Sequence, residues 1–137
     1  MSQENVEIVR RGYERYAAGD LEGVSALFSD DAELADGGGL GVADTAAGTL
    51  KGPEGFLRSA TESVEAFDDY GVEAEEFIDA GHAVVVSVRI SGSGKASGAR
   101  LETSLAHLWV FGDDGKAIRG EVYRTTIEAL NAVGPEE

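Results

Sequence analysis

The chain has 137 residues, no cysteine and a formal net charge of −15, from 26 acidic and 11 basic residues. This length suits a single domain over residues 1–137 with a core of its own, and the lack of cysteine excludes disulfides and thiol chemistry, as is usual for the cytoplasm, where we expect the protein. The negative charge argues against nucleic acid and membrane as partners, because phosphate groups would be repelled.

Two helices are expected at the N-terminal end. Residues 2–18 carry one apolar stripe, at steps of three and four residues, made of Val6, Val9, Tyr13 and Tyr16. Asp20 can cap a second, short helix. A short strand is expected over residues 30–36, followed by a glycine-rich loop over residues 37–48 that we expect to border a site.

The second half of the chain changes from helical to strand periodicity. Gly52-Pro53-Glu54 is typical of a helix start, because proline is favoured at the first helical position. From Tyr70 onward apolar residues alternate, which predicts four strands and a final short helix. We place the strands at residues 70–79, 82–91, 100–111 and 116–125, and the helix from Ile127 to Ala132.

The third of these strands is apolar on both faces. Leu105, His107, Trp109 and Phe111 share one face, whereas Ala106, Leu108 and Val110 share the other. One face should therefore meet the helices, and the other should meet another sheet, most simply in a homodimer. The whole pattern predicts an α+β fold in which N-terminal helices pack on a strongly curved antiparallel sheet, leaving a conical cavity where a ligand can bind.

Several segments also carry a resemblance to a known family. They are residues 5–22, 28–33, 51–55, 106–111 and 114–124, with words such as Gly-Asp-Leu-Glu and His-Leu-Trp-Val-Phe. Together they resemble the SnoaL-like group of the nuclear transport factor 2-like superfamily, to which ketosteroid isomerases also belong. The resemblance implies a cone-shaped α+β barrel. It implies no single activity, because this fold hosts isomerases, cyclases, hydrolases and proteins without known catalysis.

The resemblance to ketosteroid isomerases assigns two candidate catalytic residues. Without a gap, Asp36 falls on the position of their general base, and His107 falls where they keep a protonated aspartic acid for the oxyanion. Their tyrosine donor falls near Gly12, which has no side chain. Tyr13 is its neighbour, about 100° further around the helix, and Tyr16 lies one turn beyond.

SnoaL-type cyclases supply a second comparison. They often carry a His-Trp-Asp-like run on the last strand, where this chain has Gly120-Glu121-Val122 and lacks the acid on the cavity side. In this register Val122 and Arg124 face the cavity beside His107 and Trp109. Glu121 and Tyr123 should lie on the opposite face.

Each candidate has a functional and a structural interpretation. Asp36 could take a proton from a carbon next to a carbonyl group, or cap the glycine-rich loop. His107 could donate to a substrate oxygen or act as an acid or base, or be a core histidine tied to a tyrosine. Tyr13 and Tyr16 could be phenolic donors inside the cone, or core residues with hydroxyls at its rim.

Trp109 and Arg124 also have two interpretations. Trp109 could form a platform for a ligand or belong to the core. Arg124 could bind an anionic ligand group, or pair with one of the many acids.

Three functions remain open on this basis. The first is binding of a small apolar or cyclic ligand, without catalysis. The second is a cofactor-independent isomerase or cyclase in which Asp36 moves a proton and His107 stabilises the oxyanion. The third, implied by the resemblance to nuclear transport factors, is interaction with another protein through the outer face of the sheet. We expect no metal or other cofactor, because the two histidines are far apart in sequence and no cysteine is present.

Overall fold

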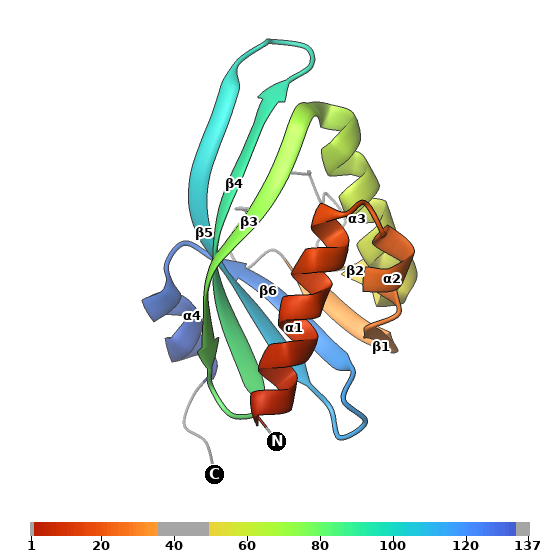
Figure 1. Ribbon diagram of the computed structural model, residues 1–137, viewed down its shortest axis with the longest axis vertical. Helices are drawn as coiled ribbons and strands as arrows, with labels where there is room; N and C mark the ends of the chain where they lie inside the picture. Colours follow the sequence, from red (N-terminus) through yellow and green to blue (C-terminus); the bar gives the residue numbers. More distant parts are fainter. Residues whose placement is uncertain (1, 36–49, 134–137) are drawn as a thin grey trace.

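The computed structural model describes residues 2–35 and 50–133. Four helices and six strands make up this part of the chain (Figure 1). In chain order they are α1 (Ser2–Ala17), α2 (Leu21–Ser25), β1 (Phe28–Ala35), β2 (Leu50–Lys51), α3 (Gly52–Ala66), β3 (Phe67–Asp79), β4 (Ala83–Gly94), β5 (Arg100–Phe111), β6 (Ala117–Tyr123) and α4 (Thr126–Val133). The predicted α+β class is confirmed, and the predicted glycine-rich loop lies outside the described residues.

The six strands form one curved sheet in the order β2-β1-β6-β5-β4-β3. The strands β3 to β6 form the expected antiparallel meander, whereas β1 joins β6 in parallel. β3 and β4 run further than the apolar alternation predicted, with Phe67 paired to Gly94 and Asp68 to Ser93. This extension is held by backbone pairing, which leaves no apolar pattern in the sequence. β2 has only two residues, too few to show a period.

The main core lies between the inner face of the sheet and the helices α1 and α3, which cover that face (Figure 1). The predicted α1 stripe is confirmed, since Val6 and Val9 are buried there and Tyr13 and Tyr16 pack against them. β4 contributes fully buried valines at alternate positions, among them Val84 and Val86. Tyr13 and Tyr16 therefore reach the inner face because they continue the stripe that anchors α1.

A second apolar cluster covers part of the outer face. Ala106 and Leu108 of β5 are buried there together with Ala129 of α4, and Leu108 is only 2% exposed. α4 lies against β4, β5 and β6 on the side away from α1 (Figure 1). The apolar outer residues that we expected to meet another sheet thus have a cover within their own chain. The sequence did not indicate this cover, because a short helix can pack on either face.

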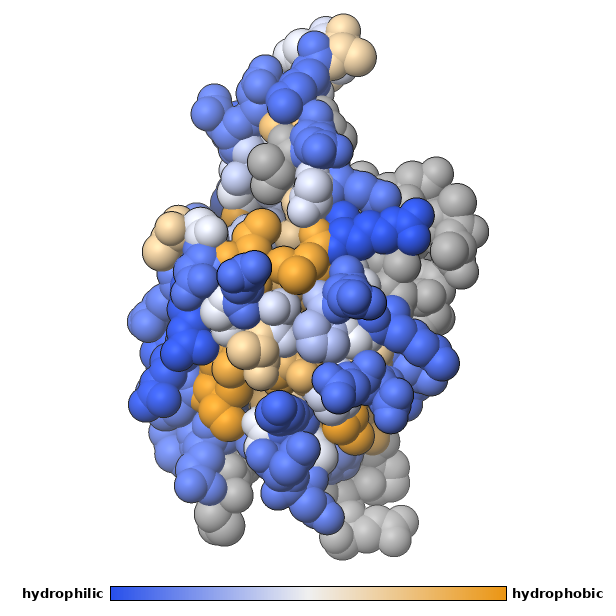
Figure 2. Space-filling model, turned by 90° about the vertical axis from the view of Figure 1, so that its right-hand side faces the viewer, coloured by the Kyte–Doolittle hydropathy of each residue, from blue (hydrophilic) through white to orange (hydrophobic). Residues whose placement is uncertain are grey.

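Hydrophilic residues dominate the helical side of the molecule, as the acidic composition predicts. Figure 2 shows this side, on which the hydrophilic residues surround smaller apolar areas. Within residues 2–35 and 50–133, no helix combines the length and the apolar character needed to cross a membrane.

Candidate functional site

The centre of the inner face is a hydrogen-bonded set of three side chains, which we call the Tyr13 triad: Tyr13, His107 and Trp109. Trp109 Nε1 donates to the Tyr13 hydroxyl oxygen over 3.0 Å. The same oxygen lies 2.6 Å from His107 Nδ1. The triad joins α1 to β5 and brings together three of the residues that the sequence singled out.

The periods of the two elements explain this meeting. Tyr13 lies on the apolar stripe of α1, which faces the sheet. His107 and Trp109 are two residues apart on β5, so both side chains point to the same face. His107 pairs with Val122 across the sheet, and Trp109 pairs with Gly120. Val122 therefore shares the inner face with the triad, as the register predicted.

Aromatic rings surround the triad. Phe77 meets the Tyr13 ring edge-on at 5.9 Å between centroids, and Phe28 lies 5.7 Å from the ring of Trp109. Phe56 of α3 stacks on Phe28 at 5.2 Å. These three phenylalanines come from different elements and show no common spacing, so the sequence carries no signal that they meet. The polar atoms of the triad consequently lie in an apolar environment.

This environment changes the titration of both ionisable groups of the triad. Burial raises the pKa of the Tyr13 phenol well above its ordinary value, although the hydrogen bond from Trp109 opposes the shift. Burial lowers the pKa of the His107 imidazole from 6.5 to about 4. At neutral pH the site therefore holds an uncharged phenol and an uncharged imidazole.

We expect His107 to make the stability of the fold depend on pH. Between about pH 6.5 and about pH 4 the unfolded chain binds a proton at this histidine that the folded chain does not bind. Stability that is present above this window is therefore lost as the pH falls through it. The wild type should therefore lose stability relative to His107→Asn as the pH falls through this window, because only the wild type carries the buried imidazole. Urea denaturation at a series of pH values measures this difference in unfolding free energy.

The second histidine provides the control for this measurement. His82 is exposed and lies outside both elements of the triad. His82→Asn removes an imidazole from an exposed position, so a comparison of the two variants isolates the effect of the buried ring. A constant difference between the wild type and His107→Asn would contradict the lowered pKa of His107.

Gly120 explains why Trp109 can take its place. A Cβ on Gly120 would lie 2.5 Å from Trp109 Cζ3 and 3.0 Å from Leu34 Cδ2. The indole ring thus occupies the space that any side chain at Gly120 would need. The resemblance to SnoaL-type cyclases implies an acid on this stretch, and the indole leaves no room for one at Gly120.

Gly12 and Tyr13, the two positions near which the tyrosine donor of ketosteroid isomerases falls, make different contacts. A Cβ on Gly12 would face Leu27, at 3.2 Å from its Cδ1 atom. The phenol at the centre of the inner face comes instead from the next residue, Tyr13, which reaches His107. The turn of about 100° between the two positions separates a contact with the turn that follows α2 from a contact with the sheet.

The other predicted site residues lie at different places. Tyr16 packs on the edge of the same core, with its ring centroid 6.4 Å from that of Phe56. Burial and, to a smaller extent, the nearby Tyr70 raise the pKa of its phenol. Arg124 is exposed just beyond the end of β6, where its backbone N–H donates to Glu128. Asp36 lies outside the described residues. The structure therefore brings Tyr13, His107, Trp109 and Val122 together, but not Arg124.

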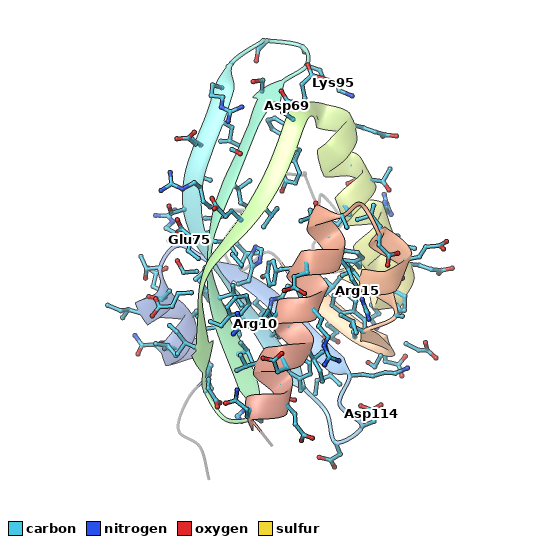
Figure 3. The ribbon with its side chains drawn as sticks, in the orientation of Figure 1. Arg10, Arg15, Asp69, Glu75, Lys95 and Asp114 are labelled. Atoms are coloured by element: carbon cyan, nitrogen blue, oxygen red, sulfur yellow. The ribbon has the colours of Figure 1, made fainter. Side chains whose placement is uncertain are left out.

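Charged groups lie around the triad rather than in it. Arg10 of α1 reaches toward the sheet (Figure 3), with its guanidinium 4.7 Å from the centre of the Phe77 ring. On the outer face Tyr123 donates to Glu121, as expected for residues on that side. Burial, followed by this hydrogen bond, raises the pKa of Tyr123 to about 12. In the described part of the chain no three histidine or acidic side chains are arranged to hold a metal ion.

Comparisons with known proteins match most of the chain. A model of the SnoaL-like domain matches residues 9–120. A search of curated proteins found no match. The chain is similar to a nuclear transport factor 2-like protein from Burkholderia thailandensis, with 24% identity, a TM-score of 0.77, and coverage of 96% of this chain and 98% of that one.

Two further solved structures have names that mention a ligand or a reaction. TerC, co-crystallised with polyporic acid, is 24% identical with a TM-score of 0.74 and covers 93% of this chain and 98% of its own. SalBIII, an epoxide hydrolase/cyclase-like enzyme in pyran ring formation, is 18% identical with a TM-score of 0.72. The match covers 91% of this chain and 95% of SalBIII. At these identities the similarity establishes a shared fold.

Proposed function

The chain belongs to the SnoaL-like domain family, and on that premise we propose that it binds a small apolar or cyclic molecule on the inner face of its sheet, without catalysis. The observation that carries this proposal is the Tyr13 triad. It presents a neutral imidazole within an aromatic surround on the inner face of a curved sheet. Sites for small molecules typically combine an apolar lining with a few polar groups.

Partial exposure of the lining supports the proposal. Tyr13, Phe56, His107, Trp109 and Val122 all retain some contact with solvent, although each packs on or within the inner core. Aromatic rings with one accessible side can cover a flat hydrocarbon ligand at little entropic cost. A ligand there would remove apolar surface from water and could hydrogen-bond to the imidazole.

The relatives add support of a general kind. TerC was co-crystallised with a small molecule, polyporic acid. The epoxide hydrolase/cyclase-like name of SalBIII favours the alternative, a cofactor-independent isomerase or cyclase with Asp36 as the base and His107 as the oxyanion donor. Both alternatives use the same inner face, so one set of measurements can separate them.

Tetralone, a bicyclic ketone, is a suitable probe for ligand binding. Titration should change the fluorescence of Trp109, the only tryptophan, in a saturable way. His107→Ala should weaken binding about tenfold, which is the effect of one lost hydrogen bond. His82→Ala, a change of the same type at an exposed turn, should leave the affinity unchanged.

The outcomes of this titration separate the proposals. Absence of a saturable change, or equal effects of the two histidine variants, would contradict ligand binding at the triad. Exchange of deuterium from solvent into the carbon next to the carbonyl group of bound tetralone would indicate proton abstraction. If Asp36→Asn then abolished the exchange without weakening binding, the enzyme alternative would replace the non-catalytic one.

A further inference from the structure

The hydrogen-bonding capacities of the Tyr13 triad limit where its hydrogens can lie. An indole N–H can only donate, whereas a phenol has one hydrogen to donate and lone pairs that accept. Trp109 therefore donates to the Tyr13 oxygen, and the Tyr13 hydrogen must find another acceptor. His107 Nδ1, at 2.6 Å, is the partner that the described residues offer for it.

The two neutral forms of His107 differ in how they satisfy this set. With its hydrogen on Nε2, His107 accepts from Tyr13 through Nδ1. The Trp109 N–H group and the Tyr13 O–H group then both have an acceptor. With its hydrogen on Nδ1, two donors would point at the Tyr13 oxygen. The phenol hydrogen would then have no acceptor among the described residues, which is costly in an apolar environment.

We propose that the directed chain from Trp109 through Tyr13 fixes His107 as its Nε2–H tautomer, so that the imidazole offers a donor, and not an acceptor, to a ligand on the inner face. Tyr13 and Trp109 are then positioning residues that act through His107. Donation from Trp109 also polarises the Tyr13 hydroxyl and strengthens its bond to Nδ1. The lowered pKa of His107 is consistent with this arrangement, because the ring stays neutral near neutral pH.

Gly120 belongs to the same arrangement. The Trp109 ring occupies the space of a Cβ at Gly120, and this position allows Nε1 to reach Tyr13. No partner for His107 Nε2 is recorded among residues 2–35 and 50–133, and the side chain keeps partial exposure. The nitrogen on the far side of the ring from Tyr13 is therefore the atom that would meet a ligand.

The tautomer deepens the proposed function by defining a ligand class, and this second step rests on that function. A ligand must bring an acceptor, such as a carbonyl or ether oxygen, to pair with the Nε2–H group. A ligand of the same shape without an acceptor would leave that donor unpaired. If the site were catalytic, His107 could stabilise negative charge on oxygen but could not take a proton through Nε2.

Heteronuclear NMR of the full chain with isotope-labelled histidine tests the first step without any ligand. Near neutral pH the two ring nitrogens of His107 should give the pattern of a neutral Nε2–H tautomer, with His82→Asn used to assign the signals. Tyr13→Phe should replace this pattern by a mixture of tautomers. Tyr16→Phe removes the same hydroxyl one turn further along α1, where no bond to His107 is recorded, and should leave the pattern unchanged.

An Nδ1–H or mixed pattern in the wild type would overturn the proposal, as would an unchanged pattern in a folded Tyr13→Phe protein. The wild-type measurement decides the question by itself if Tyr13→Phe does not fold. In the ligand step, tetralone should bind about tenfold more tightly than tetralin, the same bicycle without the carbonyl oxygen. Equal affinities for tetralone and tetralin would overturn the ligand class. If NMR shows the Nε2–H tautomer but neither compound binds, only the proposed function is overturned.

Discussion

Replacing Leu108 with alanine should lower the free energy of unfolding by about 2–5 kcal/mol. Leu108 is 2% exposed and lies between the sheet and α4, in a cluster with Val85 and Ala129. Removing its side chain leaves a cavity that the surrounding residues can only partly close. Urea denaturation followed by circular dichroism measures the loss.

Val110→Ala is the matched control. It changes the same face of the same strand, but Val110 is only partly buried, so the loss should be about 1 kcal/mol. Equal losses for the two variants would contradict the burial of Leu108 under α4.

The Val110→Ala variant also bears on self-association. We propose, as the apolar outer face first suggested, that two copies of the chain associate through this side of the sheet. The partly buried residues at the edge of the α4 cluster, such as Val110 and Tyr123, are available for such a contact. If they make it, Val110→Ala should shift sedimentation toward the monomer. An unchanged sedimentation profile, or a wild type that is monomeric, would contradict the homodimer.

Gly120→Ala should destabilise the fold by about 1–3 kcal/mol and disturb the Tyr13 triad. The added methyl group would stand 2.5 Å and 2.9 Å from two atoms of the rigid Trp109 ring, and 3.0 Å from Leu34. The ring must move, and its hydrogen bond to Tyr13 should lengthen or break. Chemical denaturation gives the stability, and the emission of Trp109 reports the displaced indole.

Gly71→Ala provides the control for this effect. A Cβ at Gly71 of β3 would meet only Ser91 Oγ, at an ordinary 3.6 Å. The same chemical change should therefore alter stability by less than about 1 kcal/mol and leave the tryptophan emission unchanged. A Gly120→Ala protein with wild-type stability and emission would show that Trp109 does not need the space over Gly120.

The packing around Gly120 also sets the chemistry of the inner face. An acid on the stretch Gly120–Val122 would face the inner side in the cyclase-like arrangement. Here Trp109 covers Gly120, and its N–H supports Tyr13 instead. The polar group of the inner face is consequently a neutral histidine supported by a phenol, which favours binding of a ligand through a hydrogen bond.

Much of the fold could be predicted because its signals are local. The α1 stripe, the change of period after Tyr70 and the alternation along β5 depend on residues a few positions apart, and each of them placed the correct side chains on the inner face. The resemblance to a known family added the roles expected of Asp36 and His107. The boundaries of β3 and β4 were less accurate, because paired backbone without alternating apolar residues leaves no sequence signal.

The sequence by itself thus determined the elements, the faces of the strands and the nature of the candidate residues. Only the tertiary structure decided which candidates touch. Tyr13 and His107 are 94 positions apart, and Tyr13 and Trp109 are 96 apart, so no local period relates them. The close approach of Trp109 to Gly120 and the cover of Leu108 by α4 likewise arise where separate elements pack. Periodicity sets the direction of a side chain from its own helix or strand, whereas its partner depends on how those elements are placed in space.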